Sequence, residues 1–381
     1  MYAEWKAEVT SPAKHRPRLV RADRRPVRRF NASRYLLYLL VSFGLSVLVT
    51  RVFLELTGYP KIGGGGAVHV AHVLWGGLLL FAGALVVLLL SNQWTLTVSS
   101  LLWGIGVGLF IDEVGKFITA NNDYFVPIAA PIIYAVFLIV AWIYMATQKP
   151  PPLTPRAELY RVLDLMKEVL DHDLDADEKK ALEMSLERVR QETADRNVYR
   201  LATELLDFVR AEELHLVDPN PSSLEQALVS ARDHAQRRIG RRSLRGLLVA
   251  AFLALALLHT ITVLTLSALV AGDPGGFSLP FQSGPQQYVL TEPLVLVLFA
   301  VLATGVGLLY VLAGYDLVRH NERRGTRAAM LALLLSLTVV NLMVYYFNLF
   351  QAMGLTLVEI VILTLVLEYR RRYVSGAALG A

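Results

Sequence analysis

The chain has 381 residues, of which 55% are hydrophobic and only 18% are charged, and its formal net charge is +5. Roughly a quarter of the residues in a soluble globular domain are charged, so this composition excludes an ordinary soluble enzyme and indicates a membrane protein. The absence of cysteine excludes disulfides, thiolate catalysis and cysteine-ligated metal or iron–sulfur sites.

The first 34 residues form an arginine-rich arm that precedes every apolar run. The first such run starts at Tyr35 and is long enough to span a membrane, so we do not interpret it as a removable signal peptide. We expect the arm to be a disordered tail that faces anionic lipid headgroups. The lipid bilayer is therefore the expected partner of these charges, and no nucleic-acid partner is expected.

Apolar stretches long enough to cross a membrane recur along the chain. A helix needs roughly 20 apolar residues to span about 30 Å of hydrocarbon. Eight stretches qualify, at 35–56, 67–90, 97–119, 126–147, 247–270, 293–313, 328–350 and 355–367. The last is the shortest, and it reaches spanning length only if its helix continues through Glu368 and Tyr369. The predicted fold is an all-α membrane protein with about eight transmembrane helices.

Lysine and arginine are unevenly distributed between the predicted loops. The N-terminal arm, the central block, residues 319–324 and residues 370–372 are basic, whereas the intervening loops are poor in positive charge. Eight spans place all the basic segments on one side of the membrane, which is the cytoplasmic side by the positive-inside rule. We expect both termini in the cytoplasm, in a multi-pass protein of the plasma membrane.

A polar block separates four predicted spans from the other four. Within it, helical periodicity runs through 157–170, 176–190, 194–213 and 223–238, which predicts a small cytoplasmic helical domain. The predicted parts are a basic arm, a first membrane half, this domain, a second membrane half and a tail, at 1–34, 35–147, 148–245, 246–369 and 370–381. Both halves enter from the same side, so a parallel 4+4 arrangement is topologically allowed.

Ionisable residues gather where the predicted second and third spans reach the outer side. His69 and His72 are three residues apart, which places their imidazoles on one helical face. The third span carries Asp112, Glu113 and Lys116, spaced so that the lysine can pair with either carboxylate. The loop that follows adds Asp123 to this group.

Small residues in the third span indicate a close helix–helix contact. Gly104 and Gly108 lie on the same helical face as Asp112, and small residues at this spacing let another helix approach. We therefore expect Asp112 to project into a contact between helices. In the first span, Arg51 and Glu55 are spaced for an ion pair with each other.

The second membrane half carries fewer ionisable residues. Glu359 lies in the last predicted span, and Asn341, Tyr345 and Asn348 form a polar stripe on one helical face of the span before it. His259 lies alone in the fifth span, and we interpret it as a histidine that is hydrogen-bonded to a neighbouring helix rather than as a functional group.

Charged groups in hydrocarbon are costly, so several at one depth are not expected to face lipid. The first interpretation is a purely structural network of salt bridges between helices. The second is a binding site or proton relay for a small ion or solute in ion- or proton-linked transport. Its candidate residues are His69, His72, Asp112, Glu113, Lys116, Asp123 and Glu359.

A third interpretation is a metal-dependent intramembrane hydrolase. His69, His72 and Asp112 would supply three ligands to a divalent metal such as zinc and leave a fourth position for water. The positive charge of Lys116 argues against this interpretation, because it lies where the cation would bind. A fourth is a sensor or scaffold whose output is the cytoplasmic domain. The sequence favours transport or binding among these hypotheses, but it identifies no substrate.

Overall fold

The computed structural model describes residues 26–58, 71–121, 123–124, 126–148, 154–171, 174–211, 240–272, 293–347 and 349–374. In this part of the chain the secondary structure is helical, without strands. The chain divides into two compact units, which are Met1–Ser33 with Lys149–Pro219 and Arg34–Gln148 with Asn220–Ala381. We call them the polar unit and the membrane unit.

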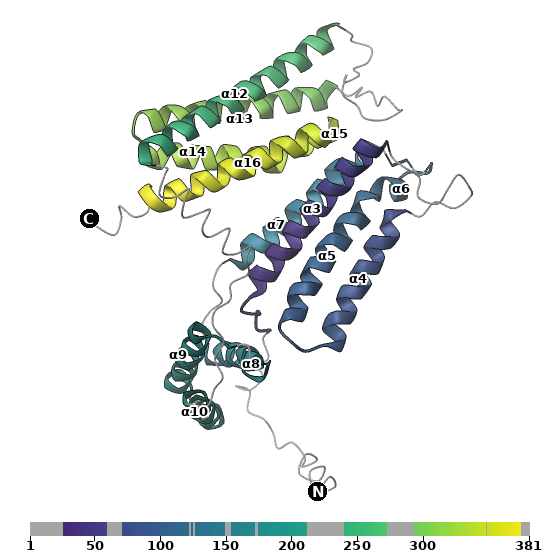
Figure 1. The fold of residues 1–381 in the computed structure, drawn as a ribbon. Coiled ribbons are helices and arrows are strands. Elements are labelled where there is room, and N and C mark those ends of the chain that lie inside the picture. The colour runs from purple at the N-terminus through teal and green to yellow at the C-terminus, as the bar shows by residue number, and fades with distance from the viewer. Residues whose placement is uncertain are drawn as a thin grey trace, which may run out of the picture. The chain divides into compact units, whose positions relative to one another are not determined.

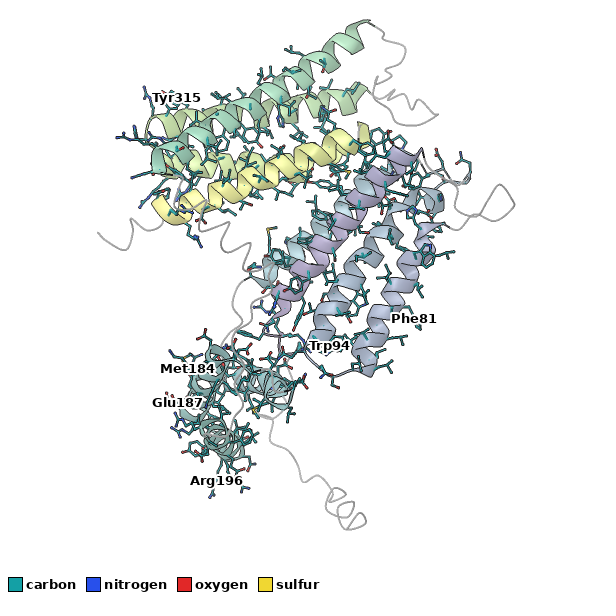
Figure 2. All side chains as sticks on the ribbon, viewed as in Figure 1. Phe81, Trp94, Met184, Glu187, Arg196 and Tyr315 are labelled. Atoms are coloured by element: carbon teal, nitrogen blue, oxygen red, sulfur yellow. The ribbon has the colours of Figure 1, made fainter. Side chains whose placement is uncertain are left out.

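Where the structure describes it, the first half of the membrane unit has four long helices and one short one (Figure 1). They are α3 (Ala32–Thr57), α4 (His72–Leu89), α5 (Trp94–Asp112), α6 (Val114–Ile118) and α7 (Ala129–Thr147). Large apolar side chains project outward from these helices, among them Phe81 and Trp94 (Figure 2). Such outward apolar faces are what lipid requires of a spanning helix.

The second half of the membrane unit packs its helices around a continuous apolar core. Its elements are α12 (Arg241–Gly272), α13 (Pro293–Val318), α14 (Glu322–Leu335), a π-helical turn η1 (Ser336–Val340), α15 (Asn341–Phe347), α16 (Leu349–Tyr369) and a second π turn η2 (Arg370–Val374). Across the described residues of both halves, eight helices are long and apolar enough to span a membrane. This confirms the predicted all-α membrane fold.

Several predicted span boundaries differ from the structure, among them those of the third, seventh and eighth spans. The third span is not one continuous helix, because α5 ends at Asp112 and Glu113 adopts a non-helical turn (φ −91°, ψ 11°) before α6. The seventh begins earlier than predicted, at Glu322, and contains the π turn. The eighth is a full-length helix that starts at Leu349, so residues 351–354, which the predicted seventh and eighth spans leave between them, are helical instead.

Glycines in α5 bring two neighbouring helices into close contact. A Cβ added at Gly108 would lie 2.8 Å from the Ser46 Cβ of α3, and one at Gly106 would lie 2.9 Å from the Gly76 carbonyl oxygen of α4. Gly104 likewise meets α3, at Ser42. These contacts confirm the predicted close approach along the Gly104–Gly108 face, because there is no room for a side chain.

In its described residues the polar unit has three helices, α8 (Pro155–Asp171), α9 (Ala176–Glu192) and α10 (Arg196–Arg210). Their apolar stripes meet in a core that includes Leu182, Leu186 and Leu206. Asp175 caps α9 in a reciprocal capping box with Glu178. The predicted helix at 223–238 lies outside the described residues.

Candidate functional site

The first polar cluster lies at the ends of helices in the first membrane half. Asp112, the last residue of α5, is fully buried. The Arg51 Nε donates to its Oδ1 at 2.5 Å, and the Arg51 guanidinium also donates to the Asp112 backbone carbonyl at 3.1 Å. The Tyr124 hydroxyl donates to Oδ2 at 2.6 Å. Asp112 therefore projects into a contact with α3, and its ion pair is with Arg51.

His72, the first residue of α4, bridges the two acidic residues. Its Nε2 lies 3.1 Å from Asp112 Oδ2, and its Nδ1 lies 3.0 Å from Glu113 Oε1. Ionised carboxylates only accept hydrogen bonds, so both ring nitrogens must donate when both acids are ionised, and the imidazole is then the cation. Lys116 Nζ adds a contact of 2.9 Å to the same Glu113 oxygen.

Arg51, Lys116 and the His72 imidazole thus face two carboxylates in what we call the helix-end cluster. Its members are Arg51, His72, Asp112, Glu113, Lys116 and Tyr124. The Tyr124 ring covers the cations, with the Arg51 guanidinium 4.5 Å and the Lys116 nitrogen 5.4 Å from its centroid. The arrangement joins α3, α4 and the α5–α6 turn, as an interhelical salt-bridge network would.

The remaining predicted residues of this region have different placements. Asp123 lies in the loop beside the cluster, where its backbone N–H donates to Thr119 Oγ1 at 2.7 Å. His69 lies outside the described residues, so the predicted position of its imidazole on the same helical face as that of His72 stays a prediction. Among the residues that are described, no group of three or more His, Cys, Asp or Glu side chains is arranged to hold a metal ion.

A second polar cluster lies within the helices of the second membrane half. Glu359 is the eleventh of the 21 residues of α16 and is fully buried. Ser336 Oγ donates to its Oε1 at 2.5 Å, and Asn341 Nδ2 donates to its Oε2 at 2.7 Å and to Thr356 Oγ1 at 3.1 Å. No lysine, arginine or histidine of the described chain forms an ion pair with Glu359. Its hydrogen-bond donors are neutral.

The π turn places both donors on the same carboxylate. Ser336 and Asn341 are five residues apart, which is a rotation of about 140° between side chains on an α-helix. In η1 the Asn341 N–H bonds to the Ser336 carbonyl, in the five-residue pattern that defines a π turn. The widened turn brings the two side chains toward one face, where each reaches one oxygen of Glu359.

The π turn also exposes a carbonyl that the first membrane half satisfies. In an α-helix the Asn341 N–H would bond to the Leu337 carbonyl, but here it bonds to Ser336 instead. The Tyr134 hydroxyl of α7 donates to that Leu337 carbonyl at 2.6 Å. Its ring also stacks on Tyr345, with centroids 4.3 Å apart.

His259 of α12 completes the second cluster. Its Nδ1 lies 2.9 Å from the Leu255 carbonyl oxygen and its Nε2 lies 3.4 Å from Ser336 Oγ. The imidazole is buried against the Tyr310 ring, at a centroid distance of 5.7 Å. We call His259, Ser336, Asn341, Thr356 and Glu359 the mid-helix cluster. The sequence predicted Glu359 as a candidate site residue and Asn341 as part of a polar stripe. No spacing or motif in the sequence indicated that His259 or Ser336 would lie beside them.

No family model, curated protein or solved structure matches this chain. The function is therefore inferred from the chemistry of the two clusters. In the helix-end cluster, both carboxylates have cationic partners. In the mid-helix cluster, one acid faces neutral donors in the middle of a helix that can span a membrane.

Proposed function

We propose that this protein takes up and releases a proton at Glu359 as a step in proton-linked transport across the membrane. The observation that carries the proposal is a fully buried carboxyl group halfway along α16, held by Ser336 and Asn341 and, within the part of the chain that the structure describes, by no cation. An ionisable residue at such a depth, roughly 15 Å from each helix end, is a strong indicator of a functional site.

The energies of the charged and neutral forms of Glu359 are comparable in this setting. An ionised side chain at the centre of a membrane helix costs roughly 3 kcal/mol on the insertion scale. Hydrogen bonds to a charged group contribute about 1.5–3 kcal/mol each, and Glu359 accepts two. The cost and the gain are of similar size, so neither form is strongly excluded. This is the property that a group needs in order to bind and release a proton.

The helix-end cluster suits this role less well. Removing one partner from a buried ion pair costs about 3–5 kcal/mol, because the other charge is left without compensation. Asp112 and Glu113 each have such partners, so a change of their charge would disrupt the joint between helices. The hydrolase hypothesis needs a histidine nitrogen with a lone pair for a metal, and both nitrogens of His72 face carboxylates. We propose that this cluster fastens the helices.

The orientation of the protein is part of the proposal. Eight alternating spans would put the basic segments on one side, which supports cytoplasmic termini, and we place the protein in the plasma membrane. With this topology Glu359 lies near the bilayer midplane. A proton could then reach it from either side as the helices rearrange.

Proton flux into liposomes tests the proposal. The full-length protein is reconstituted with a pH-sensitive dye inside, and a potassium gradient with valinomycin drives proton entry. We expect flux above that of empty liposomes, loss of this flux in Glu359→Gln, and retention in Glu368→Gln. The control makes the same chemical change on the same helix, at a residue that pairs with Arg371 and Arg372 near the helix end. Flux equal to that of empty liposomes, or equal in Glu359→Gln and wild type, would overturn it.

A further inference from the structure

Three buried side chains from three segments form a hydrogen-bonded row in the mid-helix cluster. His259 of α12 approaches Ser336 of the π turn, and Ser336 approaches Glu359 of α16. Each of the three residues is at most 4% exposed. Because water does not surround them, every hydrogen in the row must find its acceptor within the row or its immediate neighbours.

The outer ends of this row have fixed roles. The Leu255 carbonyl can only accept, so the His259 Nδ1 carries a hydrogen and donates it. At the other end, Asn341 donates to Glu359 Oε2, so that oxygen acts as an acceptor. The two atoms whose protonation can change are therefore His259 Nε2 and Glu359 Oε1. Both face the Ser336 hydroxyl oxygen.

One proton can occupy the row in two complete arrangements. In the first, His259 Nε2–H donates to Ser336 Oγ and the serine hydrogen is donated to ionised Glu359. In the second, Glu359 Oε1–H donates to Ser336 Oγ and the serine hydrogen is donated to neutral His259. Going from the first to the second, the His259 Nε2–H bond breaks and its proton forms a new O–H bond with Ser336 Oγ. The original serine O–H bond breaks at the same time, and its proton forms the O–H bond of the Glu359 carboxyl group. The net charge is zero in both.

The row makes fewer hydrogen bonds when it holds no shared proton, or two, between His259 Nε2 and Glu359 Oε1. With no such proton, the lone pairs of His259 Nε2 and Ser336 Oγ face each other, and the negative charge of Glu359 remains uncompensated. With two protons, the serine hydrogen has no acceptor in the row and a positive charge remains. Buried polar groups left in these states carry a desolvation penalty. We infer that Glu359 and His259 share one mobile proton through the Ser336 hydroxyl, which makes His259 a second proton-carrying residue.

The groups that surround the row do not supply another charge. The titratable residues near Glu359 are Tyr310 of α13, Tyr345 of α15 and Tyr134 of α7, all of them neutral phenols. The Tyr310 hydroxyl is buried beside Ser336 and Glu359. His259 is thus the internal counter-ion when Glu359 is ionised. The inference rests on the proposed function and identifies its ion as a proton, because a metal cation would compete with the imidazolium charge.

The histidine nitrogens report the shared proton directly. Purified full-length protein with ¹⁵N-labelled histidine is studied by NMR in lipid nanodiscs, and the His259 signals are assigned by their loss in His259→Gln. We expect the wild-type Nε2 shift to lie between the protonated and unprotonated values. In Glu359→Gln and Ser336→Ala it should move to the unprotonated value, whereas Ser336→Thr should retain the wild-type shift because the hydroxyl remains.

Two controls distinguish the possible failures. Glu368→Gln should leave the His259 shift unchanged, and added sodium should leave the wild-type shift unchanged. An Nε2 shift that is insensitive to both Glu359→Gln and Ser336→Ala would overturn the shared proton, and a sodium-dependent shift would overturn the identity of the ion. The NMR needs no ion gradient. If Glu359→Gln abolishes the proton flux but the His259 Nε2 shift does not respond to Glu359→Gln or Ser336→Ala, only the shared proton is refuted. If the Nε2 shift responds to these variants but the wild-type protein shows no proton flux, only the transport function is refuted.

Discussion

The Tyr134 hydroxyl donates a hydrogen bond of 2.6 Å to the Leu337 carbonyl, the backbone group that the π turn leaves without its usual helical donor. Tyr134 belongs to α7 in the first membrane half, whereas Leu337 follows Ser336 in the second. This contact therefore connects the first half to the turn that positions both donors of Glu359. It is a physical route by which movement of α7 would change the surroundings of Glu359.

Replacing Tyr134 by phenylalanine should weaken both the fold and the proton site. The variant keeps the ring but leaves a buried carbonyl without its donor, which costs about 1–3 kcal/mol. We expect the free energy of unfolding in SDS titration to fall by that amount and the proton flux to decrease. Tyr144→Phe, on the same helix, is the control and should match wild type. Wild-type flux and stability in Tyr134→Phe would show that the contact does not support the π turn.

The Arg51–Asp112 pair should contribute strongly to stability. Replacing Arg51 by methionine leaves the buried Asp112 with fewer positive partners, and we expect a loss of about 3 kcal/mol in SDS titration. The double variant Arg51→Met/Asp112→Asn should lose less than the sum of the two single variants, because the charges interact directly. The exposed pair Arg200–Glu204 is the comparison, and Arg200→Met should change stability by less than about 1 kcal/mol. Additive losses at Arg51 and Asp112 would contradict the coupling.

The glycine contact between α3 and α5 can be tested with one methyl group. In Gly108→Ala the new Cβ would meet the Ser46 Cβ at 2.8 Å and the Phe43 carbonyl oxygen at 3.0 Å, so the helices must separate. We expect a loss of about 1–3 kcal/mol in stability. Gly77→Ala meets nothing within 4 Å and should be neutral or stabilising by up to about 1 kcal/mol. Equal thermal unfolding of the two variants would contradict the close approach.

The α9 cap makes a prediction for the polar unit. Asp175→Ala removes the side chain that accepts the Glu178 N–H at 2.7 Å, and we expect a loss of about 1 kcal/mol in the stability of this unit. Hydrogen exchange of the backbone amides in the first turn of α9 should accelerate. Asp177→Ala, within the same turn, keeps the capping box and should exchange more slowly than Asp175→Ala. Equal exchange in both variants would show that the cap does not hold the helix start.

The sequence identified many residues of the candidate site but did not establish which of them contact one another across helices. The sequence predicted that Asp112 projects into a helix contact, and the structure brings it together with His72, Glu113 and Lys116. The predicted partner of Arg51 was Glu55, one turn away. The structure instead pairs it with Asp112, which is 61 residues away. Spacing along one helix reveals neighbours on that helix, but it contains no information about which other helix lies alongside.

The number and approximate positions of the spans were determined by the sequence itself, because the thickness of a bilayer sets the length of each apolar run. The small residues of α5 likewise indicated where a neighbour could approach. Only the tertiary structure decided the mid-helix cluster. His259 and Ser336 are 77 residues apart, and their contact depends on the packing of α12 against the other helices of the second membrane half and on a π turn. That turn shifts the side-chain register by a fraction of a turn, an effect of packing that hydrophobic periodicity does not show.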